Sequence, residues 1–441
     1  MVNYARLVYY LETQKRRLHW ESQKLENYRE KRLRQIVRYA YRNSPFYRKK
    51  MKSAGVKPSD IETLGDMGKL PIVTKADIRK NLDEIISVNF RKQRLINLST
   101  SGSTGNPLTL VISDAEDEFR KAGHLRANIV CGQKMRDRWA TIAGSQFNEE
   151  TSSPAKLQRF LRFYLLHRVP VFSKVQNQIA FLEKLGPQVL EGYSSSLLLL
   201  AKEVNKIGLK TIKPRIMFSG AELIDDYSRA FIEKTFGAPL YDHYATIEFE
   251  RMAWQCPDKG EYHVNADSLI MEFVDEKGAE VSSGESGAIV CTSLFNYAMP
   301  LIRYAVGDIG VPSDNECSCG IRFPMMKMLE GRKDSIVLLP DGRLISPRAL
   351  TVVMRQFDLY HDIDRFRIVQ KDVGLIEILV KLVPTASEPD LFSEKLAVHF
   401  EQLLKATKSG AKIIVKIVDD MPLDKSGKLM AVSSEIKKPF P

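Results

Sequence analysis

The segment best suited to chemistry is a short loop of hydroxyl residues and glycines. It reads Thr100-Ser101-Gly102-Ser103-Thr104-Gly105, so hydroxyl side chains and glycines fill every position. Glycines allow the backbone to bend until its N–H groups converge on an anion, and hydroxyl groups add small donors. No Gly-Lys-Ser/Thr sequence follows, so this is not a Walker A loop. The pattern predicts a phosphate-binding loop, with a plain surface turn as the alternative.

Two motifs further along the chain have residue types that can hold a nucleotide. Ser219-Gly220-Ala221-Glu222 follows an expected strand, and such a tight turn lets a flat base lie against the backbone. In residues 241–248, Tyr244 offers a ring for stacking on a purine, and Glu248 offers the oxygen ligands that Mg²⁺ prefers. Taken singly, these motifs also fit an ordinary turn and a solvent-exposed acid.

The last third of the chain adds an acid and cations near glycines. Asp308 follows Gly307, and its carboxylate can accept both hydroxyl groups of a ribose. Lys428 follows Gly427 in the final loop. A lysine on a glycine loop can be brought to a phosphate centre, where negative charge must be held during transfer.

The elements that must position these residues follow from the hydrophobic pattern. Apolar residues at helical spacing predict two helices in residues 3–42, and Asn43-Ser44-Pro45 ends the pattern. Between about 95 and 330, branched apolar runs alternate with helical stretches, which indicates an α/β domain with mixed sheets. The expected strands include 108–112, 139–143, 215–218, 268–273 and 288–292.

The tail reads as a separate α+β unit. It has expected strands at 366–370, 376–382 and 412–418 and an expected helix at 391–406. Around 330–333 the chain passes a polar joint that contains glycine. We therefore expect a large N-terminal domain at 1–333, with 1–50 a basic helical lead-in, and a small C-terminal domain at 334–441.

Composition and charge limit the class of protein. Apolar residues make up 44% and charged residues 27% of the chain, as in soluble globular proteins. Five cysteines are too few and too sparse for a disulfide framework, and neither a membrane span nor a secretory signal is visible, so we expect a cytoplasmic protein.

The net charge of +12 is concentrated at the N-terminus. Residues 1–50 hold 14 Lys and Arg against 4 Asp and Glu. The simple interpretation is a pair of helices with a solvated basic face. Peripheral contact with a membrane through this stretch stays open, whereas no nucleic-acid motif accompanies the charge and no nucleic-acid partner is expected.

Four Cys and His residues have spacing that fits a metal. Cys256 precedes His263 by seven residues, and Cys317 and Cys319 form a Cys-x-Cys-Gly turn further along. Zinc in structural sites takes four such ligands in tetrahedral geometry. The pattern predicts structural zinc, with ordinary buried thiols as the alternative.

Together, the motifs resemble the adenylate-forming superfamily, which includes the acyl-CoA synthetases. The resemblance covers the chain from about residue 30 to about residue 430. Six motifs occur in the family's order: the Ser/Thr/Gly loop, Ser-Gly-Ala-Glu, Tyr-x-x-x-Glu, Tyr-x-x-Gly-Asp, Gly-Arg-x-Asp and Ser-Gly-Lys. Residues 42–48, 70–75 and 296–304 further resemble the phenylacetate–CoA ligase branch and its capsule-biosynthesis relatives. Relatives in this branch often carry a Cys/His cluster.

The resemblance implies a role for each matched residue. The nucleotide-binding set would be Ser101, Gly102, Ser103, Thr104, Gly105, Ser219, Gly220, Ala221, Glu222, Asp242, Tyr244, Ala245, Thr246 and Asp308. Lys428, Glu248 and Arg332 would be catalytic, with Glu248 on Mg²⁺, and Asp334 would be the hinge about which the small domain rotates. The chain departs at two positions, Ala245 and Ile247, where the family has Gly and Thr. Either the geometry is altered, with Thr246 compensating, or the chemistry is slower.

The implied reaction uses ATP to make an acyl-adenylate and pyrophosphate from a carboxylic acid, then transfers the acyl group to coenzyme A. Tyr193, His243 and Phe147 are candidates for a pocket that suits an aryl acid. Two alternatives stay open: an amine or sugar acceptor, as in the capsule relatives, and a non-catalytic basic scaffold of the same fold. A homodimer is also compatible with the sequence.

Overall fold

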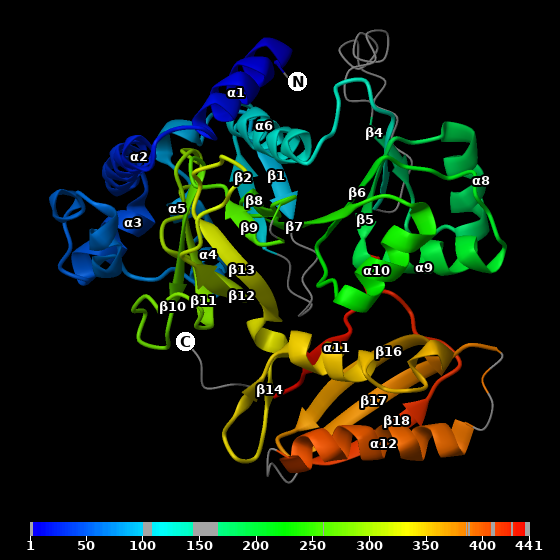
Figure 1. Ribbon diagram of the computed structural model, residues 1–441. Helices are drawn as coiled ribbons and strands as arrows, with labels where there is room; N and C mark the ends of the chain where they lie inside the picture. Colours follow the sequence, from blue (N-terminus) through cyan, green and yellow to red (C-terminus); the bar gives the residue numbers. More distant parts are fainter. Residues whose placement is uncertain are drawn as a thin grey trace.

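The computed structural model describes residues 3–99, 108–143, 166–258, 260–384, 386, 389–406, 411–424 and 427–436. Figure 1 shows a large body formed by the N-terminal and central segments, with a smaller lobe of C-terminal segments packed beneath it. The predicted loop at 100–105 and the pocket candidate Phe147 lie outside the described residues. The expected α/β class is confirmed.

One sheet of 11 strands runs through the body. Its order is β10 (Leu269–Val274), β11 (Gly287–Ser293), β12 (Tyr304–Ser313), β13 (Met325–Arg332), β9 (Tyr262–Val264), β8 (Glu250–Gln255), β7 (Leu240–Thr246), β6 (Ile216–Gly220), β5 (Val189–Tyr193), β3 (Trp139–Ile142) and β4 (Leu166–Val169). Strands from β4 to β7 pair in parallel, and those from β7 to β10 pair antiparallel.

The parallel half requires crossover helices, and the sequence supplies them with clear ends. These helices are α8 (Val175–Leu185), α9 (Ser194–Lys206) and α10 (Asp226–Phe236). Glycines in the left-handed conformation, Gly186 and Gly237, end α8 and α10. Figure 1 shows these three helices together on one side of β5 and β6. The residues that follow the carboxyl ends of β5 and β6, Ser194 and Ala221, lie on the side that faces the small lobe.

The N-terminal segment forms the expected two helices, α1 (Tyr4–Arg17) and α2 (Ser22–Asn43). Shorter elements follow: α3 (Pro45–Ser53), η1 (Pro58–Asp60), η2 (Leu64–Lys69), α4 (Lys75–Lys80), α5 (Leu82–Ile85) and η3 (Val88–Phe90). Ser44 caps α3 and Pro45 begins it, which is where the sequence pattern breaks. The hairpin of β1 (Ile96–Ser99) and β2 (Thr109–Ile112) then leads to α6 (Asp114–Val130).

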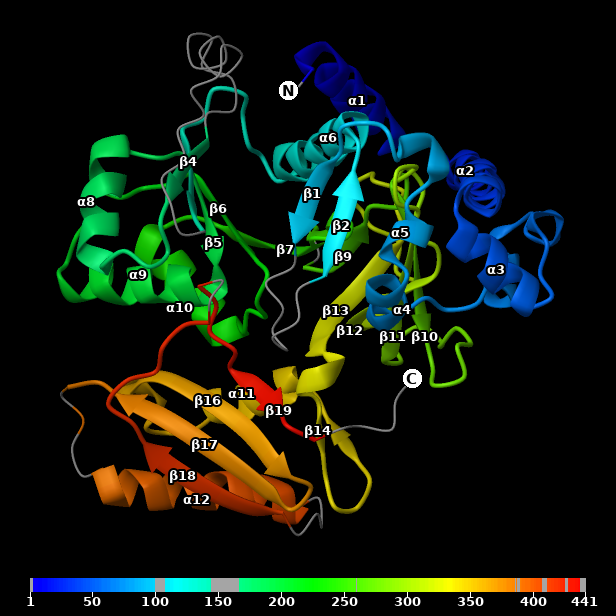
Figure 2. The ribbon, with the colours of Figure 1, turned by 180° about the vertical axis from the view of Figure 1, so that it is seen from behind.

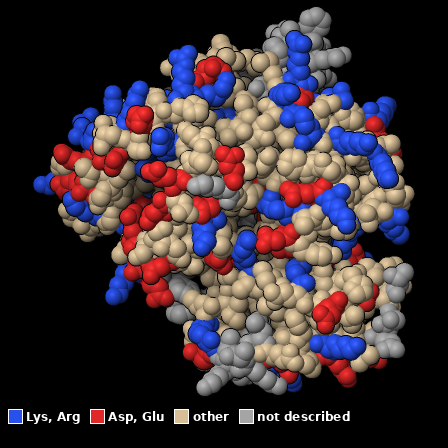
Figure 3. Space-filling model, viewed as in Figure 1, with Lys and Arg blue, Asp and Glu red and all other residues tan. Residues whose placement is uncertain are grey.

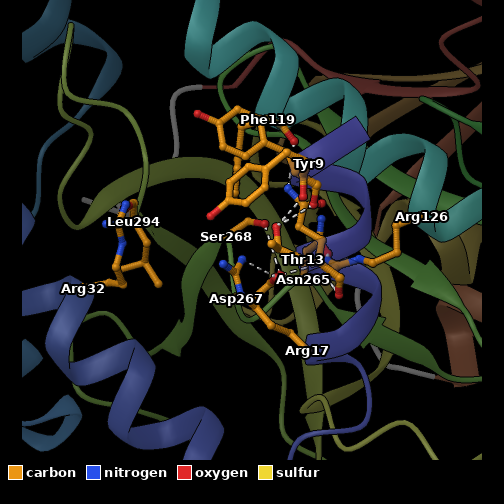
Figure 4. Close-up of polar contacts among 12 residues, drawn as sticks. Tyr9, Thr13, Arg17, Arg32, Phe119, Arg126, Asn265, Asp267, Ser268 and Leu294 are labelled. Atoms are coloured by element: carbon orange, nitrogen blue, oxygen red, sulfur yellow. Dashed lines mark hydrogen bonds and ion pairs between the residues drawn. The ribbon is translucent and has the colours of Figure 1, made fainter. Parts of the chain in front are cut away.

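A buried ion pair fastens α1 and α6 to the body (Figure 4). The Arg126 guanidinium donates to both oxygens of Asp267 at 2.9 Å, and neither side chain is exposed. Arg126 also donates to the Gln14 carbonyl at 3.0 Å, and Arg17 lies 3.3 Å from Asp267. Part of the N-terminal positive charge is therefore satisfied inside the protein.

The small lobe has its own sheet, ordered β18 (Lys412–Ile417), β17 (Leu375–Leu382), β16 (Ile363–Asp372) and β19 (Val432–Ser434). It also contains β14 (Val337–Leu338), β15 (Leu344–Ile345), α11 (Pro347–Arg355), η5 (Tyr360–Asp362) and α12 (Pro389–Ala406). Figure 2 shows α12 across one face of this sheet. Every buried residue of this core lies between Val337 and Val432, and the chain enters the lobe through η4 (Lys333–Ser335).

Candidate active site

A cavity of about 590 Å³ lies between the body and the small lobe. Figure 3 shows Lys, Arg, Asp and Glu side chains gathered along this junction. The walls include most of the described residues that the sequence predicted: Ala221, Glu222, Asp242, His243, Tyr244, Ala245, Thr246, Glu248, Asp308, Arg332, Asp334 and Lys428. Residues separated by more than two hundred positions are thereby brought to one site.

The turn after β6 has the close packing that its sequence predicts. A Cβ on Gly220 would lie 3.1 Å from the backbone oxygen of His243, so a larger residue would push β6 and β7 apart. Ala221 follows with φ of 64°, a left-handed conformation that is unfavourable for alanine. Non-glycine residues in such conformations concentrate at functional sites.

The Glu222 side chain is oriented toward protein groups. Its carboxylate accepts hydrogen bonds from the Ser195 N–H at 2.8 Å, the Ser195 hydroxyl at 3.0 Å and the Leu429 N–H at 2.9 Å. Burial raises the pKa of the Glu222 carboxyl, and these hydrogen bonds and nearby Lys428 oppose the change. Glu222 thus connects α9 of the body to the last loop of the small lobe.

Tyr244, Asp308 and Arg332 form one group in the cavity wall. The Tyr244 hydroxyl donates to Asp308 Oδ2 at 2.8 Å, and Arg332 Nε lies 4.0 Å from Asp308 Oδ1. Burial raises the pKa of Asp308, whereas Arg332 and the hydrogen bond from Tyr244 lower it. The tyrosine hydroxyl therefore fixes the carboxylate that was predicted to hold a ribose.

Glu248 is 6% exposed and has two neighbours whose roles the sequence did not reveal. Its Oε1 accepts a hydrogen bond from the Tyr304 hydroxyl at 2.9 Å and lies 3.9 Å from Lys75 Nζ. Lys75 lies in segment 70–75 and Tyr304 in segment 296–304, the two segments that resemble the phenylacetate–CoA ligase branch. That resemblance was the only sequence signal that could have pointed to these two residues. Lys75 adds a positive charge beside a carboxylate that could hold Mg²⁺.

Asp242 and Thr246 direct their polar atoms to neighbouring strands. Asp242 accepts hydrogen bonds from the Ser219 hydroxyl at 2.5 Å and the Tyr262 hydroxyl at 2.7 Å. The Thr246 hydroxyl lies 3.3 Å from Met252 Sδ and accepts the Phe249 N–H at 3.3 Å. These contacts hold β7 against β6, β8 and β9, which positions the residues between them.

Lys428 reaches the site from the small lobe. Gly427 before it has φ of 84°, and a Cβ there would overlap the Val171 side chain, so glycine is needed for this approach. The Lys428 ammonium lies 5.4 Å from the centre of the Tyr193 ring. Burial lowers the pKa of Lys428, and Glu222 and Asp424 oppose that change.

The four predicted zinc ligands come together away from this cavity. Their donor atoms all lie within 4.8 Å of one another. Cys256 Sγ is 3.3 Å from Cys317 Sγ, and Cys319 Sγ is 3.3 Å from His263 Nε2. The donors come from the end of β8, from β9 and from the segment between β12 and β13. Two thiols beside each other and an imidazole beside a third form a donor set that fits tetrahedral zinc.

Comparison with known sequences identifies relatives along most of the chain. The protein CapK of Staphylococcus aureus is 25% identical over 365 residues, covering 80% of this chain and 77% of CapK. The phenylacetate–coenzyme A ligase of Thermus thermophilus is 24% identical and covers 72% of each chain, and that of Pseudomonas putida is 23% identical and covers 85% of each. Models of protein families gave no match.

Solved structures match the fold. A 2-hydroxyisobutyryl-CoA ligase in the postadenylation state superposes with a TM-score of 0.77 at 20% identity, covering 95% of this chain and 91% of the other. The same ligase in the thioesterification state gives 0.61. An anthranilate CoA ligase with anthranoyl-AMP gives 0.57 at 15% identity, covering 83% and 73% of the two chains. Within the described ranges, no helix has the length and apolarity needed to cross a membrane.

Proposed function

Because this chain has the fold of the adenylate-forming ligases and is related in sequence to the phenylacetate–CoA ligases, we propose that it activates a carboxylic acid with ATP and transfers the acyl group to coenzyme A. One observation carries the proposal: Lys428 of the small lobe lines the same cavity as Glu248, Asp308 and Arg332 of the body. An enzyme that closes over a nucleotide needs this convergence.

In the first step, a carboxylate oxygen of the acid attacks the α-phosphorus of ATP, and pyrophosphate leaves. Lys428 supplies positive charge near the reacting carboxylate and α-phosphate, where charge stabilisation provides most of the rate enhancement. Asp308, held by Tyr244, receives the ribose hydroxyls, and Arg332 contacts the nucleotide. The backbone of 219–222 packs beside the adenine, and residues 101–105 would wrap the terminal phosphates.

Magnesium would be held by Glu248 and by phosphate oxygens. Its carboxylate fits a hard cation, and Tyr304 and Lys75 orient it. When bound, Mg²⁺ neutralises charge on the phosphates that leave.

The second step requires the small lobe to turn. Asp334 in η4, where the chain enters the lobe, would be the hinge, with residues 334–441 moving as the lid. The higher TM-score against the postadenylation state than against the thioesterification state supports an adenylation-type arrangement of the lobes in this structure. Rotation would then remove Lys428 and admit the thiol of coenzyme A, which attacks the acyl-adenylate and releases AMP.

A second candidate function shares the first step and uses an amine or sugar as acceptor. The similarity to CapK favours it. The non-catalytic scaffold is disfavoured, because Lys428 and Glu248 meet at one cavity and part of the basic N-terminus pairs internally. Peripheral membrane contact, a homodimer and a cytoplasmic location stay predictions.

For the Cys/His cluster, we propose structural zinc held by Cys256, His263, Cys317 and Cys319. Four protein ligands leave no open position for a reacting water. The ion would fasten the β8–β9 connection to the segment before β13.

The test is ATP–pyrophosphate exchange with a panel of carboxylic acids, followed by AMP release with coenzyme A or with amines. We expect exchange with at least one acid and AMP release with coenzyme A. Lys428→Ala should reduce exchange at least about a hundredfold, as expected for loss of a transition-state contact. Exchange by this variant at the parent rate would reject the assignment of Lys428. AMP release only with amines would favour the second candidate.

A further inference from the structure

An ion pair joins the body to the small lobe. Arg355 Nη2, at the end of α11, lies 3.1 Å from Asp225 Oδ2, at the start of α10. The two side chains are only 12% and 11% exposed. Figure 1 shows α10 on the body side of the junction and α11 on the small-lobe side. Within the described part of the chain, Asp225 is the only carboxylate that pairs with Arg355, so the charge of this arginine is balanced across the junction.

Aromatic rings hold the Arg355 guanidinium in its own lobe. Its central carbon lies 4.3 Å from the centre of the Tyr360 ring and 5.4 Å from that of Phe366, and both rings belong to the small lobe. Tyr227 of α10 packs edge-on against Tyr360 from the body, with 5.4 Å between the centres. A guanidinium over an aromatic face is held favourably. The arginine therefore has a fixed seat in the small lobe, and Asp225 is the charge that it meets on the other.

Asp225 is also positioned by its own lobe. It is the N-cap residue of α10, where Oδ1 accepts the Ser228 N–H at 2.9 Å and Oδ2 accepts the Ser228 hydroxyl at 2.8 Å. Asparagine caps a helix about as well as aspartate does. Asp225→Asn therefore removes the charge that faces Arg355 and keeps the cap, which separates the role of the ion pair from the stability of the helix.

A lysine makes a second connection on the same side of the junction. Lys202 Nζ, from α9 of the body, donates to the backbone oxygens of Ile363 at 3.0 Å and Asp364 at 3.2 Å. These two residues begin β16 of the small lobe. The lysine thus holds the backbone that leads into the lobe's central strands. The body meets the small lobe here through polar bonds that form only when the two are in contact.

We propose that the Asp225–Arg355 pair, here called the latch, holds the small lobe in the arrangement that brings Lys428 to the cavity. Asp225 and Arg355 are then positioning residues for adenylation, and the pair separates before acyl transfer. This role in the reaction rests on the proposed function. A charge left without its partner in a buried interface is strongly unfavourable, but water reaches both groups once the lobes separate. Loss of one partner should therefore open the lobes without unfolding either.

Amide hydrogen exchange tests the latch without any substrate. The Leu429 N–H is bonded to Glu222 across the junction, so separation of the lobes exposes it. We expect exchange in the segment containing Leu429 to be at least about tenfold faster in Asp225→Asn than in the parent. The central strands β6 and β17 should keep their protection, since neither lobe unfolds. An unchanged rate at Leu429, or equally faster exchange in β6 and β17, would overturn the inference.

The two half-reactions test the consequence for catalysis. In Asp225→Asn, pyrophosphate exchange should fall at least about tenfold, whereas acyl transfer from preformed acyl-adenylate to coenzyme A should not fall. The double variant Asp225→Asn with Arg355→Met leaves no unpaired charge and should return to within about threefold of the parent. Such a recovery is a coupling that independent residues do not show. Equal losses in both half-reactions, or losses that multiply in the double variant, would contradict the latch.

Asp341→Asn is the matched control, because Asp341 pairs with Arg343 at an exposed turn within the small lobe and should change neither measurement. If the parent exchanges pyrophosphate and Asp225→Asn does so equally well, the latch is rejected while the proposed function stands. If no acid supports exchange in the parent, the proposed function fails and hydrogen exchange alone decides the latch. Faster exchange at Leu429 in Asp225→Asn that returns to the parent rate in the double variant would support it.

Discussion

Glu222 accepts a hydrogen bond from the backbone N–H of Leu429 at 2.9 Å, across 207 positions of the sequence. Leu429 follows Lys428, so this hydrogen bond fixes the backbone beside the lysine that lines the cavity. Ser195 at the start of α9 also holds this carboxylate, because its N–H donates to Oε2 and its hydroxyl donates to Oε1, the oxygen that accepts from Leu429. One side chain of the body therefore contacts the loop of the small lobe that carries Lys428.

Glu222→Gln should loosen this connection, because an amide has one acceptor oxygen where the carboxylate has two. Hydrogen bonds to charged groups contribute about 1.5–3 kcal/mol, so we expect pyrophosphate exchange to fall about tenfold or more. Acyl transfer from preformed acyl-adenylate to coenzyme A should change little, since in the proposed mechanism the small lobe rotates away before this step. Single-turnover kinetics of the two steps would measure this.

Glu394→Gln is the matched control, an exposed glutamate on α12 that should leave both steps unchanged. If Glu222→Gln lost the same factor in adenylation and in acyl transfer, Glu222 would act on the substrate site of the body and not on the approach of the small lobe.

The charge of Lys428 predicts an alkaline limit for adenylation. Burial lowers its pKa below the ordinary value of 10.5, so the proton leaves at a lower pH than from a free lysine. Exchange requires the positive charge and should therefore decline as pH rises through this lowered pKa. Lys428→Arg, whose guanidinium stays protonated, should keep its residual activity over the same range. A profile that is flat up to pH 10.5 in the parent would contradict this.

Zinc removal should affect stability more than chemistry. Protein purified without chelator is expected to contain about one zinc per chain, and Cys317→Ser should lose most of it together with several degrees of Tm. Cys131→Ala is the control, because this buried cysteine is outside the cluster and should keep the metal. Metal-free parent protein would reject the zinc site.

A buried acid near the N-terminus of α6 predicts pH-dependent stability. Glu116 is 3% exposed, its Oε2 has no partner within the described part of the chain, and burial raises its pKa from 4.5 to about 8. The folded state then binds a proton that the unfolded state releases between these values, so the free energy of unfolding falls as pH rises from about 4.5 to 8. The loss is on the order of a few kcal/mol.

Glu116→Gln removes the ionisable group and should be more stable than the parent at pH 8, with little difference at pH 5. Denaturant unfolding at both pH values measures the effect. Glu394→Gln, being exposed, should show no such difference. Equal stability of Glu116→Gln and the parent at pH 8 would contradict this prediction, because it would show that ionising the Glu116 carboxyl does not destabilise the folded state.

Much of this protein could be predicted from its sequence, because the signals are local. Apolar spacing predicted α1 and α2, and branched apolar runs predicted β2, β3, β6, β10 and β11 in the body and β16, β17 and β18 in the small lobe. The order of the motifs predicted the fold family. The set of motifs in the family's order indicated Glu248, Asp308 and Lys428 as groups for a nucleotide, and the Cys/His spacing indicated a metal cluster whose donor atoms the structure brings together.

Only the tertiary structure determined how distant side chains pair. Lys75 reaches Glu248, and Glu222 holds Leu429. Such relationships depend on strand order and on the packing of one lobe against another, and neither leaves a periodic trace in the sequence. The sequence therefore determined which chemical groups are present, whereas folding decided which of them meet, because contact depends on positions in space and not on spacing along the chain.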